Sequence, residues 1–293
     1  MNDTQHGRLQ LQVDIEKRTL KSPFHITGYT FTGFDALVVT LREGGCSGRG
    51  EAQGVYYKHD NPPEMLAQIE ALRDRIERGI TRADLLDCLP PGGARNALDA
   101  ALWDLEARRR SVPAWQLAGI DPPRPLLTTF TIGADDPARM AEHARAFADA
   151  HALKLKLTDD AQNAGRVRAV RAARPDVWIM VDANQGFTRD SLSRLLPTLQ
   201  ECRIALIEQP FPIGNENWLD GMDRPIPIAA DESVQDHTDL ARLAGRVDTI
   251  NIKLDKCGGL TEALAMASQA RAMGFDLMVG NMSGSSLAMA PAF

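Results

Sequence analysis

The second half of the chain alternates between short apolar runs and amphipathic helical stretches, and this alternation constrains the fold most strongly. From Pro125 onward we expect seven strands, with amphipathic segments between them in which apolar residues recur at helical spacing. The expected strands are 126–132, 153–157, 177–183, 204–209, 226–232, 249–254 and 276–280. Repeated strand–helix units are typical of parallel sheets whose strands are covered by helices. The pattern therefore predicts an α/β fold.

Two architectures fit such a pattern, a (β/α)8-type barrel and an open, doubly wound sheet. A doubly wound sheet that binds nucleotides carries a glycine-rich turn after a strand, and no such turn or P-loop follows any of the seven runs. We therefore expect a (β/α)8-type barrel in which seven βα units are visible and the eighth strand is missing from the sequence. A barrel that lacks one strand would expose sheet edges and core. Because the sequence stops at Phe293 without an eighth strand, we expect the protein to continue beyond it.

Residues 1–120 differ in character and are expected to form an α+β capping domain, with the barrel domain spanning 121–293. Strand-like alternation is present in LQLQV and in DALVVTLRE, and helical spacing in 63–79 and, most strongly, in 96–106. Between the two strand runs, residues 24–34 carry two glycines and several aromatic residues. This composition is typical of a mobile binding loop or of a plain hairpin connection.

The charge balance and the cysteines exclude several classes of protein. A formal net charge of −6 at pH 7 is opposite to the basic surface of nucleic-acid binders. No run of about 18 apolar residues is present to cross a membrane, and the polar start lacks the apolar segment of a signal peptide. The four cysteines are far apart, which disfavours structural zinc and is typical of reduced thiols in a cytoplasm. We expect a cytoplasmic protein that binds a small molecule, without a nucleic-acid or membrane partner.

Residues 153–157 read Leu-Lys-Leu-Lys-Leu. In a strand, Lys154 and Lys156 point to one face and the three leucines to the other. On an exposed edge strand, such lysines would face water and discourage aggregation. As the second strand of a barrel, the same run would turn its leucines toward the helices and its lysines toward the interior. The series of βα units around it favours the second interpretation.

Expected strands two to six each end in a charged residue that a buried strand would otherwise avoid, and the seventh is closed by Gly280-Asn281. These residues are Lys156, Asp182, Glu208, Asp231 and Lys253. In a barrel, the carboxyl ends of all strands meet at one rim, where such folds hold their active sites. The pattern therefore predicts that these five side chains lie together.

The three carboxylates among them predict a metal site. Clustered in a partly buried mouth, they would repel one another unless a cation joined them. A single carboxylate at such a position could instead cap the following helix, but three on consecutive strands, flanked by two lysines, do not fit that explanation. Oxygen ligands without histidine favour Mg²⁺, with Mn²⁺ as the second choice.

Several motifs together resemble the enolase superfamily and, within it, the muconate-lactonising subgroup. They are Lys154-x-Lys156, VDAN at 181–184, IEQP at 207–210, ADES at 230–233, NIKLDKCGG at 251–259 and, in the expected helix, ALDAALWDLEA at 97–107. The resemblance implies removal of a proton next to a carboxylate and stabilisation of the enediolate by Mg²⁺. It implies that Lys156 is a base and that Lys154, a like charge on the same face, lowers its pKa and contacts the substrate carboxylate.

The NIKLDKCGG string resembles the dipeptide epimerases more than the other branches of the subgroup. Lys156 and Lys253, nearly opposite each other, suit a proton transfer in which one removes the α-proton and the other reprotonates the opposite face. We therefore hypothesise an epimerase of an L,L-dipeptide. The alternatives are a muconate-type cycloisomerase, an o-succinylbenzoate synthase or N-acylamino-acid racemase, and a non-catalytic barrel. The Asp-x-Asp pair expected to hold the substrate ammonium in dipeptide epimerases would lie beyond Phe293.

Substrate contacts are expected from the capping loops and from the strand ends. The candidates are Lys154, Tyr29, Tyr56, Thr131, Asn184, Asn281 and Met282, with His25, Phe31, Tyr57 and Lys58 as further loop residues. Thr131 is equally explained by β-propensity and Asn184 by a turn. The first loop carries no arginine, which disfavours an acidic substrate side chain and favours a hydrophobic or small one. The resemblance also leads us to expect a homo-oligomer.

Overall fold

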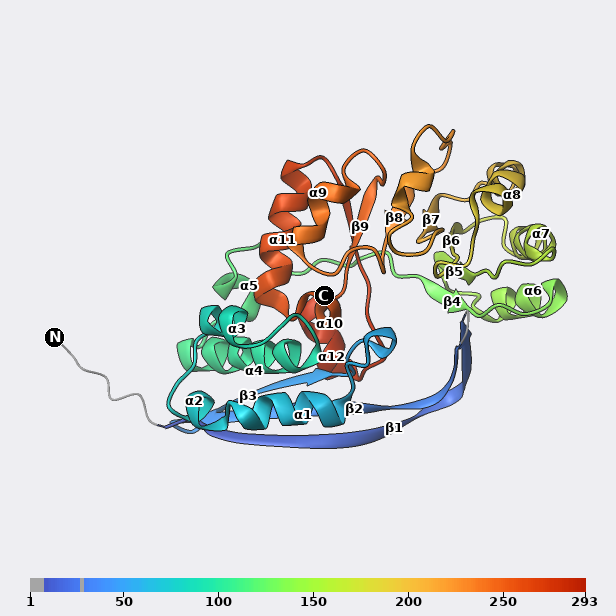
Figure 1. The fold of residues 1–293 in the computed structure, drawn as a ribbon. Coiled ribbons are helices and arrows are strands. Elements are labelled where there is room, and N and C mark those ends of the chain that lie inside the picture. Colours follow the sequence, from blue (N-terminus) through green and yellow to red (C-terminus); the bar gives the residue numbers. More distant parts are fainter. Residues whose placement is uncertain (1–7, 27–28) are drawn as a thin grey trace.

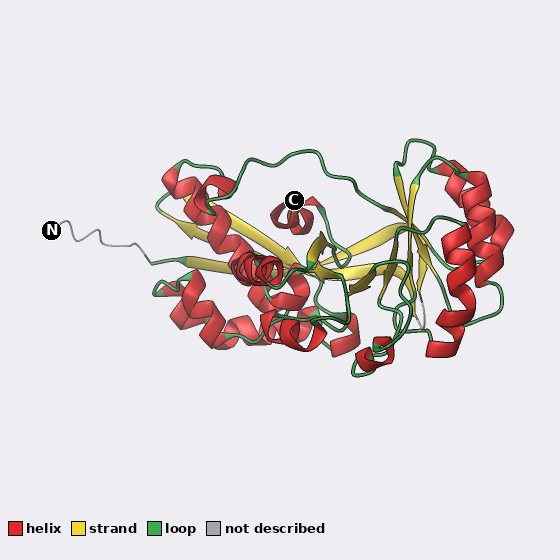
Figure 2. Cartoon of the chain, turned by 90° about the horizontal axis from the view of Figure 1, so that it is seen from above, coloured by secondary structure: helices red, strands yellow, loops and turns green. Residues whose placement is uncertain are grey.

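The computed structural model describes residues 8–26 and 29–293, and the side chains of residues 21–29 lie outside the description. An antiparallel sheet with helices is followed by a parallel sheet whose outer side is covered by helices (Figures 1 and 2). The elements of the first part are β1 (Gln10–Ile26), β2 (Tyr29–Glu43), β3 (Cys46–Ala52), η1 (Tyr56–Lys58), α1 (Pro62–Ala71), α2 (Arg73–Glu77), α3 (Arg82–Cys88), α4 (Gly93–Arg110) and α5 (Ala114–Leu117).

The second part begins at β4. Its elements are β4 (Phe130–Ile132), α6 (Pro137–Ala146), β5 (Ala152–Lys156), α7 (Asn163–Ala173), β6 (Trp178–Asp182), α8 (Arg189–Glu201), β7 (Leu206–Glu208), η2 (Glu216–Leu219), β8 (Ile228–Ala230), η3 (His237–Asp239), α9 (Leu240–Leu243), β9 (Thr249–Ile252), α10 (Leu254–Cys257), α11 (Leu260–Ala272), β10 (Asp276–Val279), α12 (Ser286–Met289) and η4 (Ala290–Ala292).

The first part is built on a long hairpin. β1 pairs antiparallel with β2, and β2 with β3. Residues 24–26 pair with residues 29–31, so the described part of 24–34 is strand. The prediction of a mobile loop there is wrong for the described residues, and the hairpin interpretation is correct. A ladder of backbone hydrogen bonds outweighs the turn-like composition of this stretch.

Helix α4 packs on β3, and two glycines of β3 let it approach closely. A Cβ added at Gly48 would lie 2.2 Å from the carbonyl oxygen of Ala101, and one at Gly50 would lie 2.0 Å from that of Ala97. Contacts this short are impossible, so only glycine fits at these two positions. The packing buries most of α4, including Leu98 and Ala101.

Substitution of Gly50 by alanine is therefore expected to destabilise the protein by about 1–3 kcal/mol or more, because the added methyl group must push backbone away from backbone. The change in the free energy of unfolding is measured by urea unfolding, with circular dichroism as the signal. The neighbouring Ser47→Ala serves as the control, since residue 47 lies on the other face of the strand from Gly48 and Gly50. An unchanged unfolding midpoint for Gly50→Ala would contradict this packing.

The second part confirms the predicted seven-stranded parallel sheet. The strand order is β10-β9-β8-β7-β6-β5-β4, with each strand parallel to its neighbours. The first predicted strand began too early, because β4 starts only at Phe130. Leu126 and Leu127 are 64% and 62% exposed and have no strand partner within the described sheet. Apolar composition alone does not make a strand without a neighbour to pair with.

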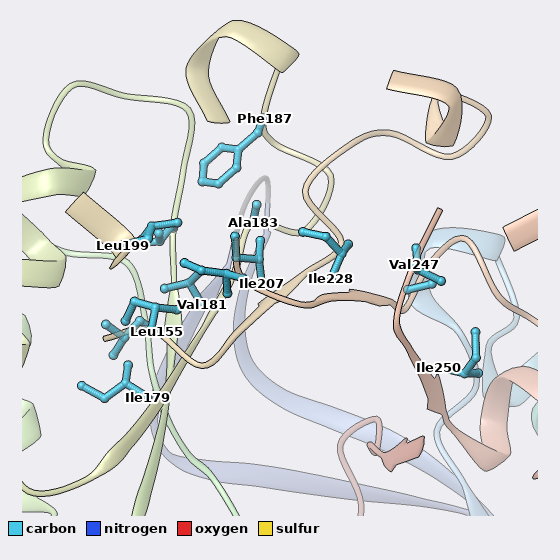
Figure 3. Close-up of a cluster of buried hydrophobic side chains, with 14 of the residues drawn as sticks. Leu155, Ile179, Val181, Ala183, Phe187, Leu199, Ile207, Ile228, Val247 and Ile250 are labelled. Atoms are coloured by element: carbon cyan, nitrogen blue, oxygen red, sulfur yellow. The ribbon is translucent and has the colours of Figure 1, made fainter. Parts of the chain in front are cut away.

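The two faces of the parallel strands differ as the alternation predicted. Leu155 of β5, Ile179 and Val181 of β6 and Ile207 of β7 point outward into one large apolar core against the helices (Figure 3). Leu153 of β5 belongs to the same core. The residues between them point to the inner face, where Lys154 and Lys156 lie. The leucines therefore face the helices, and the lysines face the barrel interior.

Within the described ranges, α4 is the longest helix, with 18 residues. No helix of this part of the chain combines the length and apolar character needed to cross a membrane.

Candidate active site

The register of the parallel strands places three predicted site residues side by side. Lys156 is the register partner of Asp182, and Asp182 is the partner of Glu208. All three lie at the carboxyl end of their strand and on its inner face. Because paired residues of neighbouring strands point the same way, the side chains meet.

Lysine ammonium groups lie directly among these carboxylates. Lys154 Nζ lies 2.7 Å from Asp182 Oδ2 and 2.6 Å from Glu208 Oε2, so it bridges the two strands. Lys156 Nζ donates to Asp182 Oδ2 at 2.6 Å and to Asn184 Oδ1 at 2.8 Å. Buried charges of one sign are stable only when paired, and here each lysine lies beside a carboxylate.

Asp231 carries a second cluster one strand further on. Lys253 Nζ donates to its Oδ2 at 2.6 Å. Lys256 Nζ donates to its Oδ1 at 2.7 Å, to its main-chain carbonyl and, at 3.0 Å, to Asn251 O. The side chain of Lys256 is only 1% exposed. Asp231 is thus held between two ammonium groups.

The pKa values of the carboxylates reflect these contacts. Burial raises the pKa of Asp182, but the ammonium groups of Lys154 and Lys156 outweigh it and lower the value to about 2. The pKa of Asp231 lies well below its usual range because Lys253 and Lys256 likewise outweigh burial. For Glu208, burial and the neighbouring Asp182 raise the pKa.

Lys156, Lys154 and Lys253 differ in the direction in which their pKa is shifted. Burial lowers the pKa of Lys156, and the charge of Lys154 adds to this effect, in the direction that a general base requires. The pKa of Lys154 is raised, because Asp182 and Glu208 outweigh burial. That of Lys253 is raised as well, because Asp231 outweighs burial.

Strained backbone follows two of the carboxylates. Asn184 (φ 43°), Gln185 (φ 71°) and Gln209 (φ 37°) occupy the left-handed region although none is glycine, at a cost of about 1–3 kcal/mol each. The side chain of Gln209 offsets part of this cost. Its Oε1 accepts from the amides of Asp231 and Ser233, and its Nε2 donates to Ser233 Oγ and Phe211 O. Gln209 thereby ties the end of β7 to the end of β8.

A pocket lies over Lys156, Lys253 and Asp231, between the two parts of the chain. The residues that line it are Phe31, Gln53, Tyr56, Tyr57, Lys156, Asn184, Asp231, Glu232, Lys253, Asn281, Met282 and Ser283. Both lysines predicted to exchange protons thus face one space. β6, β7 and β8 separate the strand that carries Lys156 from the strand that precedes Lys253.

The predicted substrate contacts divide into three groups. Tyr56, Asn184, Asn281 and Met282 line the pocket together with Phe31 and Tyr57. Lys154 lies between Asp182 and Glu208 and is not among the lining residues, and Thr131, its register partner on β4, is not among them either. The side chains of Tyr29 and His25 lie outside the described residues.

Several residues of the site were given no role in the sequence interpretation. Lys256 holds Asp231, Gln209 ties two strand ends, and Glu232 accepts from Asn184 Nδ2 at 3.1 Å. Gln53 of the first part accepts from the amide of Ser283 at 2.7 Å. The first three lie inside the quoted motifs, where their polar character in a buried segment was the available signal. Gln53 had no such signal.

The three carboxylates fit a hard cation in donor type. Asp182, Glu208 and Asp231 are at most 2% exposed and offer only oxygen ligands, which Mg²⁺ prefers. Across residues 8–26 and 29–293, however, no group of three or more His, Cys, Asp or Glu side chains is arranged to hold a metal ion. Lys154 and Lys253 contact the three carboxylates and balance the charge that a cation would otherwise balance.

Two protein families match the chain, one to each part. Residues 9–119 match the family described as mandelate racemase / muconate lactonizing enzyme, N-terminal domain. Residues 139–293 match the family described as enolase C-terminal domain-like.

Comparison with individual proteins agrees with the two family matches. The L-Ala-D/L-Glu epimerase of Escherichia coli strain K12 is 40% identical over 275 residues, which cover 93% of this chain and 85% of that enzyme. An enolase family member from Agrobacterium tumefaciens with homology to dipeptide epimerases, solved with sodium and L-Ala-L-Glu, is 44% identical with a TM-score of 0.93, covering 97% of this chain and 87% of its own. The dipeptide epimerase from Methylococcus capsulatus, solved with Mg and L-Arg-D-Lys, is 32% identical with a TM-score of 0.91. The match covers 97% of this chain and 86% of that chain.

Proposed function

This chain belongs to the enolase superfamily, as a racemase or epimerase similar to the dipeptide epimerases, and on that premise we propose that it is a Mg²⁺-dependent epimerase of dipeptides. The observation that carries the proposal is the shared pocket of Lys156 and Lys253. Two ammonium groups on different sides of one pocket can serve the two faces of a carbon atom between them. Inversion of a stereocentre by proton transfer needs this arrangement.

The reaction begins with removal of the α-proton next to the C-terminal carboxylate of the dipeptide. One of the two lysines, as the free amine, takes this proton. The other, as the ammonium, gives a proton to the opposite face, and the configuration is inverted. Both side chains are largely buried, so little water competes for the proton in transit.

The cation site of the proposal consists of Asp182, Glu208 and Asp231. Mg²⁺ bound there would supply positive charge against the negative charge that develops on the substrate carboxylate. Lys154, beside Asp182 and Glu208, adds further positive charge at the same place. Gln209 and Lys256 keep the carboxylates in position.

The remaining pocket residues hold the dipeptide. Asn184, Asn281 and Met282 border the reacting end with Lys156 and Lys253, and Tyr56 closes the pocket from the first part of the chain. Phe31 and Tyr57 pack edge to face against Tyr56. These aromatic rings favour an apolar substrate side chain, whereas the similarity to the E. coli enzyme favours glutamate.

Incubation with a dipeptide library in D₂O and Mg²⁺ tests the proposal. The library includes L-Ala-L-Glu and L-Ala dipeptides that end in a hydrophobic residue. We expect α-deuterium in the C-terminal residue of at least one member, detected by mass spectrometry, together with the epimeric product. The absence of α-deuterium in every member would refute the proposal, and the member with the highest kcat/KM would identify the preferred side chain.

A further inference from the structure

Helix α10, a single turn between Lys253 and the pair Gly258-Gly259, lies where the two parts of the chain meet (Figure 1). We propose that Arg95 and Asp99 of α4 are positioning residues for Lys253, and that they act on it through α10. The inference rests on the proposed function, because it concerns the lysine that serves one face of the substrate. It assigns a role in the reaction to a helix of the first part that does not line the pocket.

Arg95 holds the carboxyl end of α10. Its side chain donates from Nη2 to Cys257 O at 2.6 Å and from Nε to Gly258 O at 3.1 Å. A third bond runs from Nη1 to Leu89 O at 3.2 Å. The last carbonyl groups of a helix have no partner within the helix, and the guanidinium group supplies one. Arg95 is 4% exposed, and these bonds to described residues all go to main-chain carbonyls.

Asp99, one turn further along α4, holds the start of α11. Its carboxylate accepts from Thr261 N at 3.0 Å and from Thr261 Oγ1. Trp103, one more turn along, donates from Nε1 to the same hydroxyl at 3.0 Å. Residues four apart lie on one face of a helix. One face of α4 therefore fixes both ends of the link between α10 and α11.

The link itself is shaped to α4. Gly258 (φ 79°) and Gly259 (φ 117°) adopt left-handed conformations. A Cβ at Gly258 would lie 2.3 Å from Arg95 Nε, and one at Gly259 would lie 2.5 Å from Asp99 Oδ2. The two glycines thus allow the charged groups of α4 to reach the backbone.

The other end of α10 leads to the reacting groups. Lys253 is the residue directly before the helix, and Lys256 lies within it. Both donate to the carboxylate of Asp231. Since α10 has only four residues, a displacement at Gly258 reaches both ammonium groups with little intervening structure to absorb it.

The other lysine has different supports. Lys156 is carried by β5 and bonded to Asp182 and Asn184, and α4 makes none of these contacts. Loss of Arg95 should therefore disturb one side of the pocket and spare the other. General destabilisation of the protein would not produce this asymmetry.

Arg95→Met tests the inference. The α-proton exchange rate in D₂O is measured separately for each epimer of the best dipeptide, and Lys253→Ala defines which epimer depends on Lys253. We expect exchange from that epimer to fall about tenfold or more through kcat, because small misplacements of a reacting group are costly, while exchange from the other changes less than twofold. Arg95→Lys, which keeps a donor and the charge, should restore part of the loss.

Arg174→Met is the matched control. Arg174 is also buried, and it donates to main-chain carbonyls such as Ala150 O at 2.7 Å, but it lies among α6, β5 and α7. Its loss should lower stability and leave the ratio of the two exchange rates unchanged. If Arg95→Met does not fold, Asp99→Asn, which keeps the shape of the side chain, takes its place.

The outcomes separate the two proposals. An unchanged ratio in folded Arg95→Met or Asp99→Asn, while the wild-type protein exchanges both epimers, would refute the positioning role alone. Absence of exchange in the wild-type protein with every dipeptide would refute the proposed function, and the positioning role with it. A ratio that shifts equally in Arg174→Met would also refute the positioning role, because the shift would then reflect stability.

Discussion

Replacement of Lys253 by alanine is expected to abolish net epimerisation of a dipeptide while α-proton exchange continues on one of its two epimers. Lys156 and Lys253 line one pocket from different sides. Without Lys253, Lys156 still removes the proton that faces it, but no group delivers a proton to the opposite face. General acid–base groups contribute about 10²–10⁴-fold to a rate, and the loss of epimerisation should fall in that range.

Lys156→Ala should give the mirror-image result, with exchange retained only on the other epimer. Proton NMR in D₂O follows exchange of each epimer, and chiral chromatography follows epimerisation. Lys17→Ala, at an exposed position of β1, is the control and should behave like the wild-type protein. Equal loss of exchange from both epimers in either variant would contradict opposed lysines and would favour a one-base reaction of the cycloisomerase type.

Removal of divalent cations is expected to have the second large effect. Chelation should abolish turnover, and Mg²⁺ should restore it, with Mn²⁺ as a substitute. Mg²⁺ should also raise the melting temperature, because a ligand at 100 times its Kd stabilises the folded state by about 2.7 kcal/mol. In Glu208→Gln the stabilisation should disappear, since the amide keeps the shape of the side chain but removes one of the three buried negative charges. Differential scanning fluorimetry measures the melting temperature of the wild-type protein and of Glu208→Gln, each with and without Mg²⁺.

Glu216→Gln is the matched control for the metal prediction. Glu216 is also a buried glutamate in an ion pair, with Arg242 at 2.7 Å, but its carboxylate also accepts from the Gly214 amide and contacts none of the lysines of the site. This variant should retain the full Mg²⁺-dependent gain. If Glu208→Gln gains as much from Mg²⁺ as the wild-type protein does, the assignment of the carboxylates to the metal is wrong.

The sequence predicted most of the parallel sheet, because its signals are local. Alternation in 153–157 follows directly from the geometry of a strand, and the burial of Leu153 and Leu155 against helices agrees with it. The errors came where tertiary pairing decided the outcome. Residues 126–129 have apolar and β-branched side chains but no partner strand among the described residues, and residues 24–34 look like a loop although their described part is paired in β1 and β2.

The sequence also predicted that the charged residues gather at one edge of the sheet. It did not predict which side chains contact one another there. Parallel strands of similar phase bring their carboxyl ends to one edge, so Lys156, Asp182 and Glu208 had to be neighbours once the βα order was known. The sequence interpretation gave Lys154 a contact with the substrate carboxylate, and it did not predict that the Lys154 ammonium lies between Asp182 and Glu208. The angle at which a side chain leaves its strand depends on every neighbour, and no spacing encodes it.

Three features could be predicted from the amino-acid order alone: the alternation of strands and helices, the inward direction of the lysines and the chemistry at the strand ends. Periodicity of two and the shared direction of parallel strands are properties of the local chain, so a reader of the sequence can apply them. Other features became visible only once the chain had packed: Arg95 and Asp99 cap α10 and α11, Lys256 holds Asp231, and Gln53 contacts Ser283. These bonds join residues far apart in the chain, and their partners are main-chain groups or buried side chains that carry no signal until the two parts have packed together.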